Sequence, residues 1–323
     1  MRLCASPRMY ILQSRQKKPL YGCFSSEHKI IIIDEKRYNW QGLLLHVIIR
    51  EKWELIYMKY GYCTDLNFLE GDETSRAIFE GIIKAGFDYV ELPFSKLSEL
   101  SGEQIAKLKD ELKKIPCKAC NLFFPPALTI VGTGMNANGI MAYLERMLPL
   151  AAEIGIETLV FGNGGARKIP SGGTRESIWQ NLRLITEIME INAAKAGITI
   201  CIEPLNTTET NIINSYSEAV ELSFGLKNVS AMIDSYHVAM EKQTYEDAIK
   251  YPDSVKHLHT AYPTGRMVPS PEDDMSLYAD FAKAIKAIGY DDKISIEGAL
   301  RSKSPTDIHS EIKSALGILK SLF

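Results

Sequence analysis

The feature that most constrains the fold is an alternation of short β-rich runs with longer helical patterns, repeated eight times after Met58. Between the runs, apolar residues recur at helical spacing, as at Ile178, Leu182 and Ile185 before a helix-ending Gly197. Strands that alternate with helices pair in parallel, because parallel neighbours need a crossover connection. The eight runs are Tyr60 to Cys63, Tyr89 to Leu92, Ala119 to Phe123, Thr158 to Phe161, Thr199 to Ile202, Ser230 to Ile233, Val255 to His259 and Ile294 to Glu297.

Eight strand-helix units within residues 58–323 match the size of a closed (β/α)8 barrel, typically about 250 residues. We therefore predict an α/β fold, a (β/α)8 TIM barrel. An open, doubly wound sheet is the alternative. Such sheets often carry a Gly-x-Gly-x-x-Gly dinucleotide fingerprint after a strand, and the glycine-rich segment from Gly162 to Gly173 lacks that spacing.

Residues 1–57 differ from the rest of the chain. They hold ten Lys and Arg against five Asp and Glu, a net charge of +5, which leaves −8 for residues 58–323. Their apolar clusters show neither a sustained helical period nor paired strands with turn signals. We predict an N-terminal extension over 1–57, poorly ordered or accessory, or translated upstream sequence if Met58 is the start, and a catalytic barrel over 58–323.

Composition and charge exclude several functional classes. A formal net charge of −3 gives no broad positive field for nucleic acid or an anionic membrane. The longest apolar runs are far shorter than the roughly 20 residues that span a bilayer, and the N-terminus lacks the pattern of a secretory signal. Six cysteines in so long a chain indicate a reducing compartment. We expect a cytoplasmic protein that binds neither nucleic acid nor membrane.

Polar residues close four consecutive predicted strands, at the end of the barrel where active sites lie. Carboxylates clustered there would be costly to bury and would repel one another, and a bound cation removes both costs. Three oxygen ligands and one imidazole suit Mn²⁺, Mg²⁺, Co²⁺ or Zn²⁺. By strand alternation His257 and His259 point the same way, so either can be the imidazole ligand, and His259 lies nearer the strand end. The predicted metal ligands are Glu203, Asp234, His259 and Glu297.

These motifs resemble those of the xylose-isomerase-like TIM barrels, a superfamily of sugar and sugar-phosphate isomerases and epimerases, and in particular the ketose 3-epimerases. The resemblance covers Met58 to the C-terminus and rests on Ile-Glu203-Pro-Leu-Asn, Asp234-Ser-Tyr-His237, His259 and Ile-Glu297-Gly. It implies one divalent metal, with Mn²⁺ the first expectation, held by the four predicted ligands. It also implies that the two glutamates move protons.

The resemblance further implies substrate contacts from Glu209, from His237 and from an arginine after the histidine ligand. Arg266 is the candidate for that arginine. It stands seven residues after His259, beyond a Pro263-Thr-Gly265 turn, and does not reproduce the family's usual H-x-x-E-x-x-R spacing.

The function predicted from the resemblance is a metal-dependent isomerase or epimerase of a keto-sugar or sugar phosphate. A metal that chelates the carbonyl and adjacent hydroxyl acidifies the C–H between them and stabilises a cis-enediolate. Epimerisation needs one base on each face of that intermediate, and we expect Glu203 and Glu297 to supply them. The alternatives are a metal-dependent dehydratase of a cyclic keto-polyol such as an inosose, and a catalytically silent sugar-binding barrel. We expect a homo-oligomer of two or four copies.

A nuclease is disfavoured, because the apurinic endonucleases of the same superfamily need further histidines for a zinc cluster. This chain has no histidine between His46 and His237.

Three further features have competing interpretations. Arg167, in the glycine-rich segment, could hold a phosphate or a sugar hydroxyl at the barrel mouth, or lie in a mobile loop. Glu91, at the end of the second strand, could contact substrate or pair with a lysine. Cys117-Lys-Ala-Cys120 has the spacing of a redox pair, but lies at the start of the third strand with no second pair, and is interpreted as two structural thiols.

Overall fold

The computed structural model describes residues 9–13, 19–24, 30–33 and 58–323. The chain divides into two compact units, Met1–Leu55 and Ile56–Phe323. In the first unit, the strands β1 (Met9–Gln13), β2 (Pro19–Phe24) and β3 (Ile30–Ile33) form an antiparallel sheet in the order β1-β2-β3. These strands pair although the sequence shows no clear turn signals between them. The linkers 14–18 and 25–29 contain Ser but no Gly, Pro, Asn or Asp, so the strongest turn signals are missing from the sequence.

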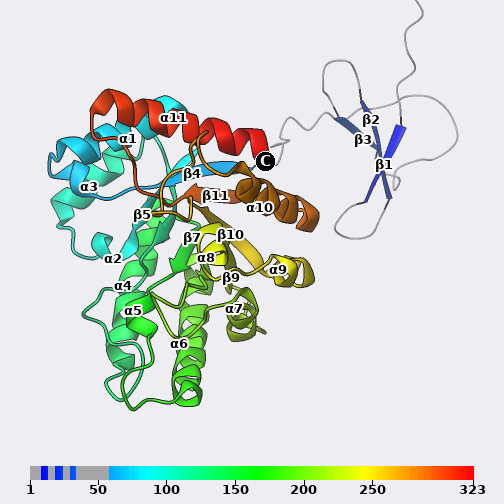
Figure 1. Cartoon of the computed structure of the whole chain (residues 1–323). Helices are drawn as coiled ribbons and strands as arrows, with labels where there is room; N and C mark the ends of the chain where they lie inside the picture. Colours follow the sequence, from blue (N-terminus) through cyan, green and yellow to red (C-terminus); the bar gives the residue numbers. More distant parts are fainter. Residues whose placement is uncertain (1–8, 14–18, 25–29, 34–57) are drawn as a thin grey trace, which may run out of the picture. The chain divides into compact units, whose positions relative to one another are not determined.

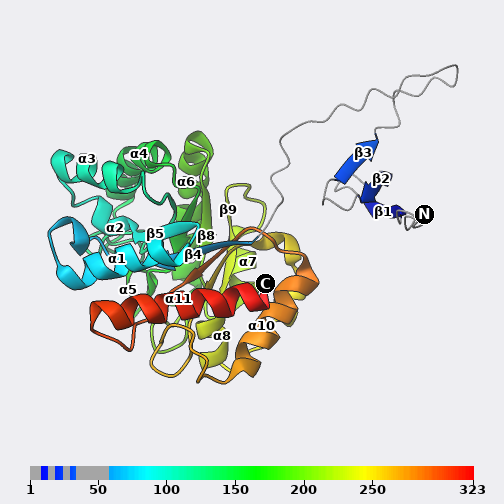
Figure 2. The same ribbon diagram turned by 90° about the horizontal axis from the view of Figure 1, so that it is seen from above.

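In the second unit, eight strands close into a parallel barrel, in the order β10-β11-β4-β5-β6-β7-β8-β9 (Figures 1 and 2). The predicted (β/α)8 barrel is thereby confirmed. The strands are β4 (Lys59–Cys63), β5 (Tyr89–Pro93), β6 (Cys117–Asn121), β7 (Thr158–Phe161), β8 (Thr199–Ile202), β9 (Val229–Asp234), β10 (Val255–Thr260) and β11 (Lys293–Ile296).

Helices surround the barrel, and α1 packs against α11 on the side where β4 meets β11 (Figure 1). The α-helices are α1 (Glu73–Ala85), α2 (Phe94–Leu97), α3 (Gly102–Glu111), α4 (Ala137–Ile154), α5 (Gly164–Arg167), α6 (Arg175–Ala196), α7 (Tyr216–Ser223), α8 (Ser235–Met240), α9 (Glu246–Lys250), α10 (Met275–Ile288) and α11 (Pro305–Leu322). Short 3-10 turns are η2 (Asn67–Leu69) and η3 (Pro252–Ser254). Within the described residues, no helix has the length and apolar character needed to span a membrane.

Local sequence signals set the helix ends. The Asp72 side chain accepts a hydrogen bond from the Ser75 backbone N–H at the start of α1, and Gly86 ends that helix with a left-handed φ of 86°. A glycine tolerates this conformation without the steric cost that a Cβ would bring. Gly197 ends α6 in the same way, as its position in the sequence predicts.

The third barrel strand begins two residues before the predicted run. Its first residue, Cys117, pairs with Val90 of β5, and the register shifts directly afterwards. Phe123, expected at the strand end, lies beyond it and packs against Phe124. Cys117 and Cys120 are free, buried thiols whose sulfurs lie 3.8 Å apart.

A side chain of β5 crosses a glycine of β4 and contacts a side chain of β11. Ser295 of β11, Gly61 of β4 and Tyr89 of β5 lie in register. The Tyr89 hydroxyl is 2.8 Å from the Ser295 hydroxyl, so the phenol ring passes over Gly61. An added Cβ at Gly61 would stand 2.2 Å from two ring carbons of Tyr89, which leaves no room for any other residue.

We expect Gly61→Ala to lower the free energy of unfolding by about 1 to 3 kcal/mol, the usual cost of overpacking a core. Urea unfolding followed by circular dichroism measures the change. The control is Gly317→Ala in α11, where an added Cβ meets nothing within 4 Å. Because alanine is the better helix former, this control should be neutral or stabilising, by up to about 1 kcal/mol. Equal stability of the two variants would contradict the close contact.

Candidate active site

The structure brings the four predicted metal ligands together at the carboxyl ends of adjacent strands. Glu203 follows β8, Asp234 ends β9, His259 lies near the end of β10 and Glu297 follows β11. One ligand atom from each lies within 4.8 Å of the other three. Adjacent strands in a closed barrel make this convergence a direct result of topology.

Backbone pairing fixes these positions. His259 is in register with Asp234 on one side and Ser295 on the other. The Glu297 backbone N–H donates to the Thr260 carbonyl at 3.0 Å. The Asp234 carboxylate accepts from the Tyr236 backbone N–H at 2.9 Å, which caps α8 and orients the side chain. The ligand set therefore sits on the strand framework rather than on free loops.

The ring of His259 has two different environments. Its Nδ1 lies 3.1 Å from Glu297 Oε2 and 3.3 Å from Glu203 Oε1, inside the cluster. Its Nε2 lies 3.0 Å from Glu91 Oε1. His257 lies outside the four-residue cluster, with its Nε2 2.9 Å from Glu91 Oε2. Of the two histidines left open by the sequence, the structure places His259 among the carboxylates.

Burial and neighbouring charges give the carboxyl groups different proton affinities. Burial raises the pKa of Asp234 to about 6, against the opposing effect of Arg266. Burial also raises the pKa of Glu203, and the charge of Glu297 adds to that shift. On Glu297 burial acts in the same direction, but His259 and Arg266 outweigh it and lower the pKa of Glu297 to about 2. Glu203 therefore holds a proton more readily than Glu297.

The candidate substrate-binding residues lie directly beside the cluster. His237 Nδ1 accepts the Asn206 backbone N–H at 3.1 Å, which leaves its Nε2 3.5 Å from Asp234 Oδ2. Arg266 donates to both Asp234 and Glu297 and lies 3.7 Å from Glu209 Oε1.

Arg266 reaches the cluster despite its unusual spacing. A tight turn closes between Tyr262 and Met267, whose backbone groups pair with each other, and Arg266 itself has a positive φ of 51°. The guanidinium carbon lies 4.6 Å from the ring centroid of Tyr236. This turn compensates for the unusual spacing between His259 and Arg266, so the Arg266 side chain still reaches the site.

Arg167 lies at the carboxyl ends of β7 and β8, but its side chain points into the protein and not to the surface of a mobile loop. Its side chain is fully buried and donates to the carbonyls of Phe161 and Glu203. The guanidinium therefore fastens the ends of β7 and β8 together. The sequence shows only a cation in a glycine-rich segment, which does not distinguish an exposed arginine from one that holds backbone carbonyls.

Glu91 lies beneath the site, fully buried, with both carboxylate oxygens hydrogen-bonded. Its partners are histidines rather than the lysine that we considered. Burial raises its pKa, but His259 and His257 outweigh this effect and hold the pKa of Glu91 well below its usual value.

Asn121 is a site residue that the sequence reasoning missed. It ends β6, and its Nδ2 donates to Glu297 Oε1 at 2.8 Å. The sequence does show a polar residue at this position, but the predicted strand lay two residues too far toward the C-terminus, so Asn121 fell inside it and not at its end.

A cavity of about 430 Å³ opens beside Asn121, between the ends of β4 and β6 and the segment after Glu297. Its lining includes Cys63, Thr64, Asn121 and Ala299. It adjoins the cluster through Asn121, which contacts Glu297.

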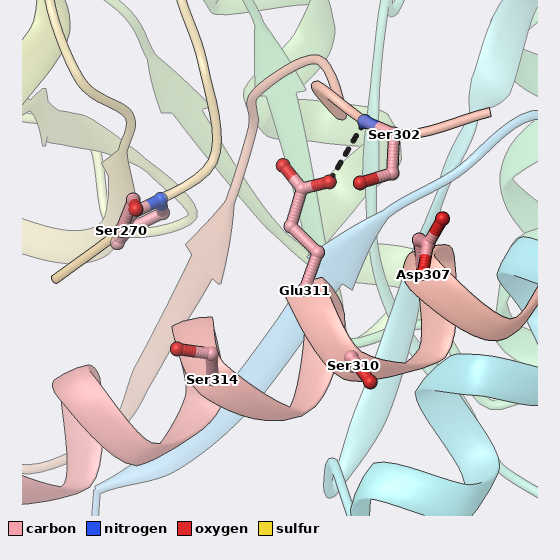
Figure 3. Close-up of a pocket in the computed structure, with 7 residues that line it drawn as sticks. Ser270, Ser302, Asp307, Ser310, Glu311 and Ser314 are labelled. Carbon is pink, nitrogen blue, oxygen red and sulfur yellow. Dashed lines mark hydrogen bonds between the residues drawn. The ribbon is translucent and has the colours of Figure 1, made fainter. Parts of the chain in front are cut away.

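A second cavity, of about 360 Å³, lies between α11 and the loops around Ser270 and Ser302 (Figure 3). Its carboxylates are engaged with the chain itself. Glu311 accepts the Ser302 backbone N–H at 2.9 Å, and Asp307 accepts the Ser304 hydroxyl at 2.5 Å. Both carboxylates of this cavity are therefore already hydrogen-bonded within the chain.

The donor set fits a divalent cation. Glu203 Oε1 and His237 Nε2 are buried without a hydrogen-bond partner among the described residues. Buried polar atoms of this kind are normally satisfied, so a ligand is expected between them. Gly162 makes room for the Glu203 carboxylate, because an added Cβ there would stand 1.9 Å from Glu203 Oε2.

Comparison with known proteins places the chain in a family. The model of the xylose isomerase-like TIM barrel family matches residues 79–322. The chain belongs to this family, as its motifs predicted.

Among curated relatives, D-psicose 3-epimerase of Agrobacterium fabrum is 25% identical over 261 residues, covering 72% of this chain and 82% of that protein. The 3-dehydro-D-guloside 4-epimerase of Escherichia coli is 25% identical over 181 residues, covering 52% of this chain and 66% of that protein. A solved structure of D-psicose 3-epimerase with D-tagatose from Clostridium cellulolyticum has a TM-score of 0.65 at 20% identity, covering 82% of this chain and 99% of that one. This last likeness supports the fold.

We expect Gly162→Ala to displace the Glu203 carboxylate and to weaken Mn²⁺ binding by at least about tenfold, as loss of a ligand's support commonly does. Isothermal titration calorimetry measures the dissociation constant. Gly165→Ala, in the same segment, is the control because its Cβ meets nothing within 4 Å. If both variants bound Mn²⁺ equally weakly, the cause would be a change in the loop backbone and not a displacement of the Glu203 carboxylate.

Acid should release the metal. A raised pKa means that a carboxyl group keeps its proton to higher pH, so Asp234, with a pKa of about 6, begins to take up a proton as the pH falls through that value. A protonated carboxyl group is a poor ligand, and the Mn²⁺ dissociation constant should rise up to roughly tenfold per pH unit below pH 6. Titrations between pH 7.5 and 5 test this, and a constant affinity across that range would contradict it.

Proposed function

We propose that the protein is a divalent-metal-dependent epimerase or isomerase of a ketose sugar, with its activity in residues 58–323. The observation that carries the proposal is the convergence of Glu203, Asp234, His259 and Glu297 on a single point. The relatives named for 3- and 4-epimerisation of sugars support the same class of reaction.

The metal site would hold Mn²⁺, with Mg²⁺, Co²⁺ or Zn²⁺ as the other ions suited to this donor set. When bound, the ion polarises the substrate carbonyl and stabilises the negative charge that develops beside it. Assembly in two or four copies and a cytoplasmic location stay predictions from the sequence.

Glu203 and Glu297 are the proposed proton-transfer groups. They follow β8 and β11, with β9 and β10 between them, so they approach the site from different sides. Their environments push their pKa values apart, upward for Glu203 and down to about 2 for Glu297. A pair of carboxyl groups separated in this way suits one group that delivers a proton and one that removes it.

The surrounding residues would orient the sugar. His237 Nε2 faces the cluster without a hydrogen-bond partner among the described residues, so it can donate to a substrate oxygen. Arg266 and Glu209 lie beside it and supply further polar contacts. Asn121 holds Glu297 through Oε1, while Arg266 donates to Oε2, so the carboxylate is oriented from both sides.

The test incubates the protein with Mn²⁺ and a panel of ketoses in D₂O. We expect deuterium at the carbon beside the carbonyl of at least one sugar, detected by NMR, together with its epimer or isomer. Glu203→Gln should lower the rate at least about a hundredfold, a typical contribution of one acid-base group. Glu153→Gln, an exposed carboxylate paired with Lys109, is the matched control and should keep the wild-type rate.

The alternatives predict different products. A dehydratase would lose water and give a product with new ultraviolet absorbance. A silent sugar-binding barrel would bind without exchange in any variant. Exchange that persists in Glu203→Gln would show that the base is another residue.

A further inference from the structure

A fully buried carboxylate, Glu91, lies directly behind the proposed metal site. It accepts hydrogen bonds from His257 Nε2 at 2.9 Å, from His259 Nε2 at 3.0 Å and from the Ser295 hydroxyl at 2.6 Å. Ser295 is in turn 2.8 Å from the hydroxyl of Tyr89, the ring that crosses Gly61. The network reaches across the barrel interior, because Glu91 is on β5 and both histidines are on β10.

This network is costly for a barrel core. Apolar side chains of similar volume would avoid the desolvation of a carboxylate and two imidazoles. Neither Lys nor Arg side chains pair with Glu91 within the described residues, so it does not neutralise a structural cation. Both of its oxygens are engaged, so it does not contact substrate. The remaining role for Glu91 is its effect on His257 and His259.

The hydrogen bond to Glu91 determines which nitrogen of His259 faces the metal site. Because Glu91 is an acceptor, Nε2 must carry a proton whatever the charge of the ring. In the neutral ring, which is the form that can bind a metal, Nδ1 is then the nitrogen with the lone pair, and it lies 3.3 and 3.1 Å from Glu203 and Glu297. A carboxylate behind a metal-binding histidine fixes both its tautomer and its ring orientation.

We propose that Glu91 is the positioning residue that holds His259 in its metal-binding tautomer, and that Ser295 and Tyr89 hold Glu91 in turn. This rests on the proposed metal site but is independent of the sugar and of the reaction. It replaces the substrate-binding role that the sequence suggested for Glu91.

Two variants of Glu91 disturb its hydrogen bonds to the histidines in different ways. Glu91→Gln keeps the length of the side chain and loses its charge, whereas Glu91→Asp keeps the charge and retracts it by one methylene. If the hydrogen bond positions His259, both variants should raise the Mn²⁺ dissociation constant about 10- to 100-fold. Electron paramagnetic resonance of free Mn²⁺ measures it without substrate.

A spectroscopic readout follows the tautomer itself. Zn²⁺ is diamagnetic, so the protein loaded with Zn²⁺ and labelled with ¹⁵N-histidine shows which ring nitrogen carries hydrogen. With only six histidines in the chain, the His259 signals are assigned by their loss in His259→Gln. We expect an Nε2–H proton protected from exchange in the wild type and unprotected in both Glu91 variants.

Glu157→Gln removes a carboxylate that pairs with Lys118 and Lys293, away from the cluster, and should leave affinity and spectrum unchanged. Ser295→Ala, which removes support from Glu91, should weaken binding less than threefold. Unchanged affinity and spectrum in both Glu91 variants, or a wild-type His259 protonated at Nδ1, would overturn the proposal even if melting temperatures fall. Failure of the wild type to bind either ion would overturn the proposed function as well.

Discussion

The structure depends on the balance of negative charge at the ends of four neighbouring strands. Glu203, Asp234 and Glu297 meet in one buried place, and Glu91 adds a fourth carboxylate directly beneath. Like charges at such distances repel strongly in a low-dielectric interior, so cations and hydrogen-bond donors must surround them. Arg266 and the two histidines of β10 supply part of that compensation. A divalent ion bound to Glu203, Asp234 and Glu297 would supply the remaining positive charge. The proposed chemistry and the stability of the buried carboxylates therefore depend on the same ion.

Glycines make this concentration of charge sterically feasible. Gly162 leaves space for the carboxylate of Glu203, and Gly61 lets the ring of Tyr89 cross to Ser295. Both positions lie on or directly after barrel strands, where a side chain would normally pack. Gly61 and Gly162 therefore support the site because they have no side chain, and this role is hard to recognise from the sequence alone.

Much of the fold was predictable because the barrel repeats one pattern. Apolar runs of β-rich composition marked all eight strands, and acidic or imidazole side chains closed four of them, so the cluster followed from topology. The role of Glu91 was not predictable, because its partners are 166 and 168 residues away and nothing local distinguishes a carboxylate that binds histidine from one that binds lysine. The backbone partners of Arg167 were not predictable for the same reason: carbonyl acceptors have no sequence signature. The strands of the first unit were not predicted because their linkers lack Gly, Pro, Asn and Asp, the strongest turn signals.

The turn that carries Arg266 is fastened to the segment after Glu297. The Ala299 backbone N–H donates to the Arg266 carbonyl at 2.8 Å, and the Val268 N–H donates to the Ala299 carbonyl at 3.0 Å. These two hydrogen bonds join the turn that carries Arg266 to the segment that follows Glu297, so a displacement of one segment would also displace the other. The cavity beside Cys63 and Thr64 is lined by Ala299 of this same segment, so the turn that positions Arg266 is hydrogen-bonded to one wall of that cavity.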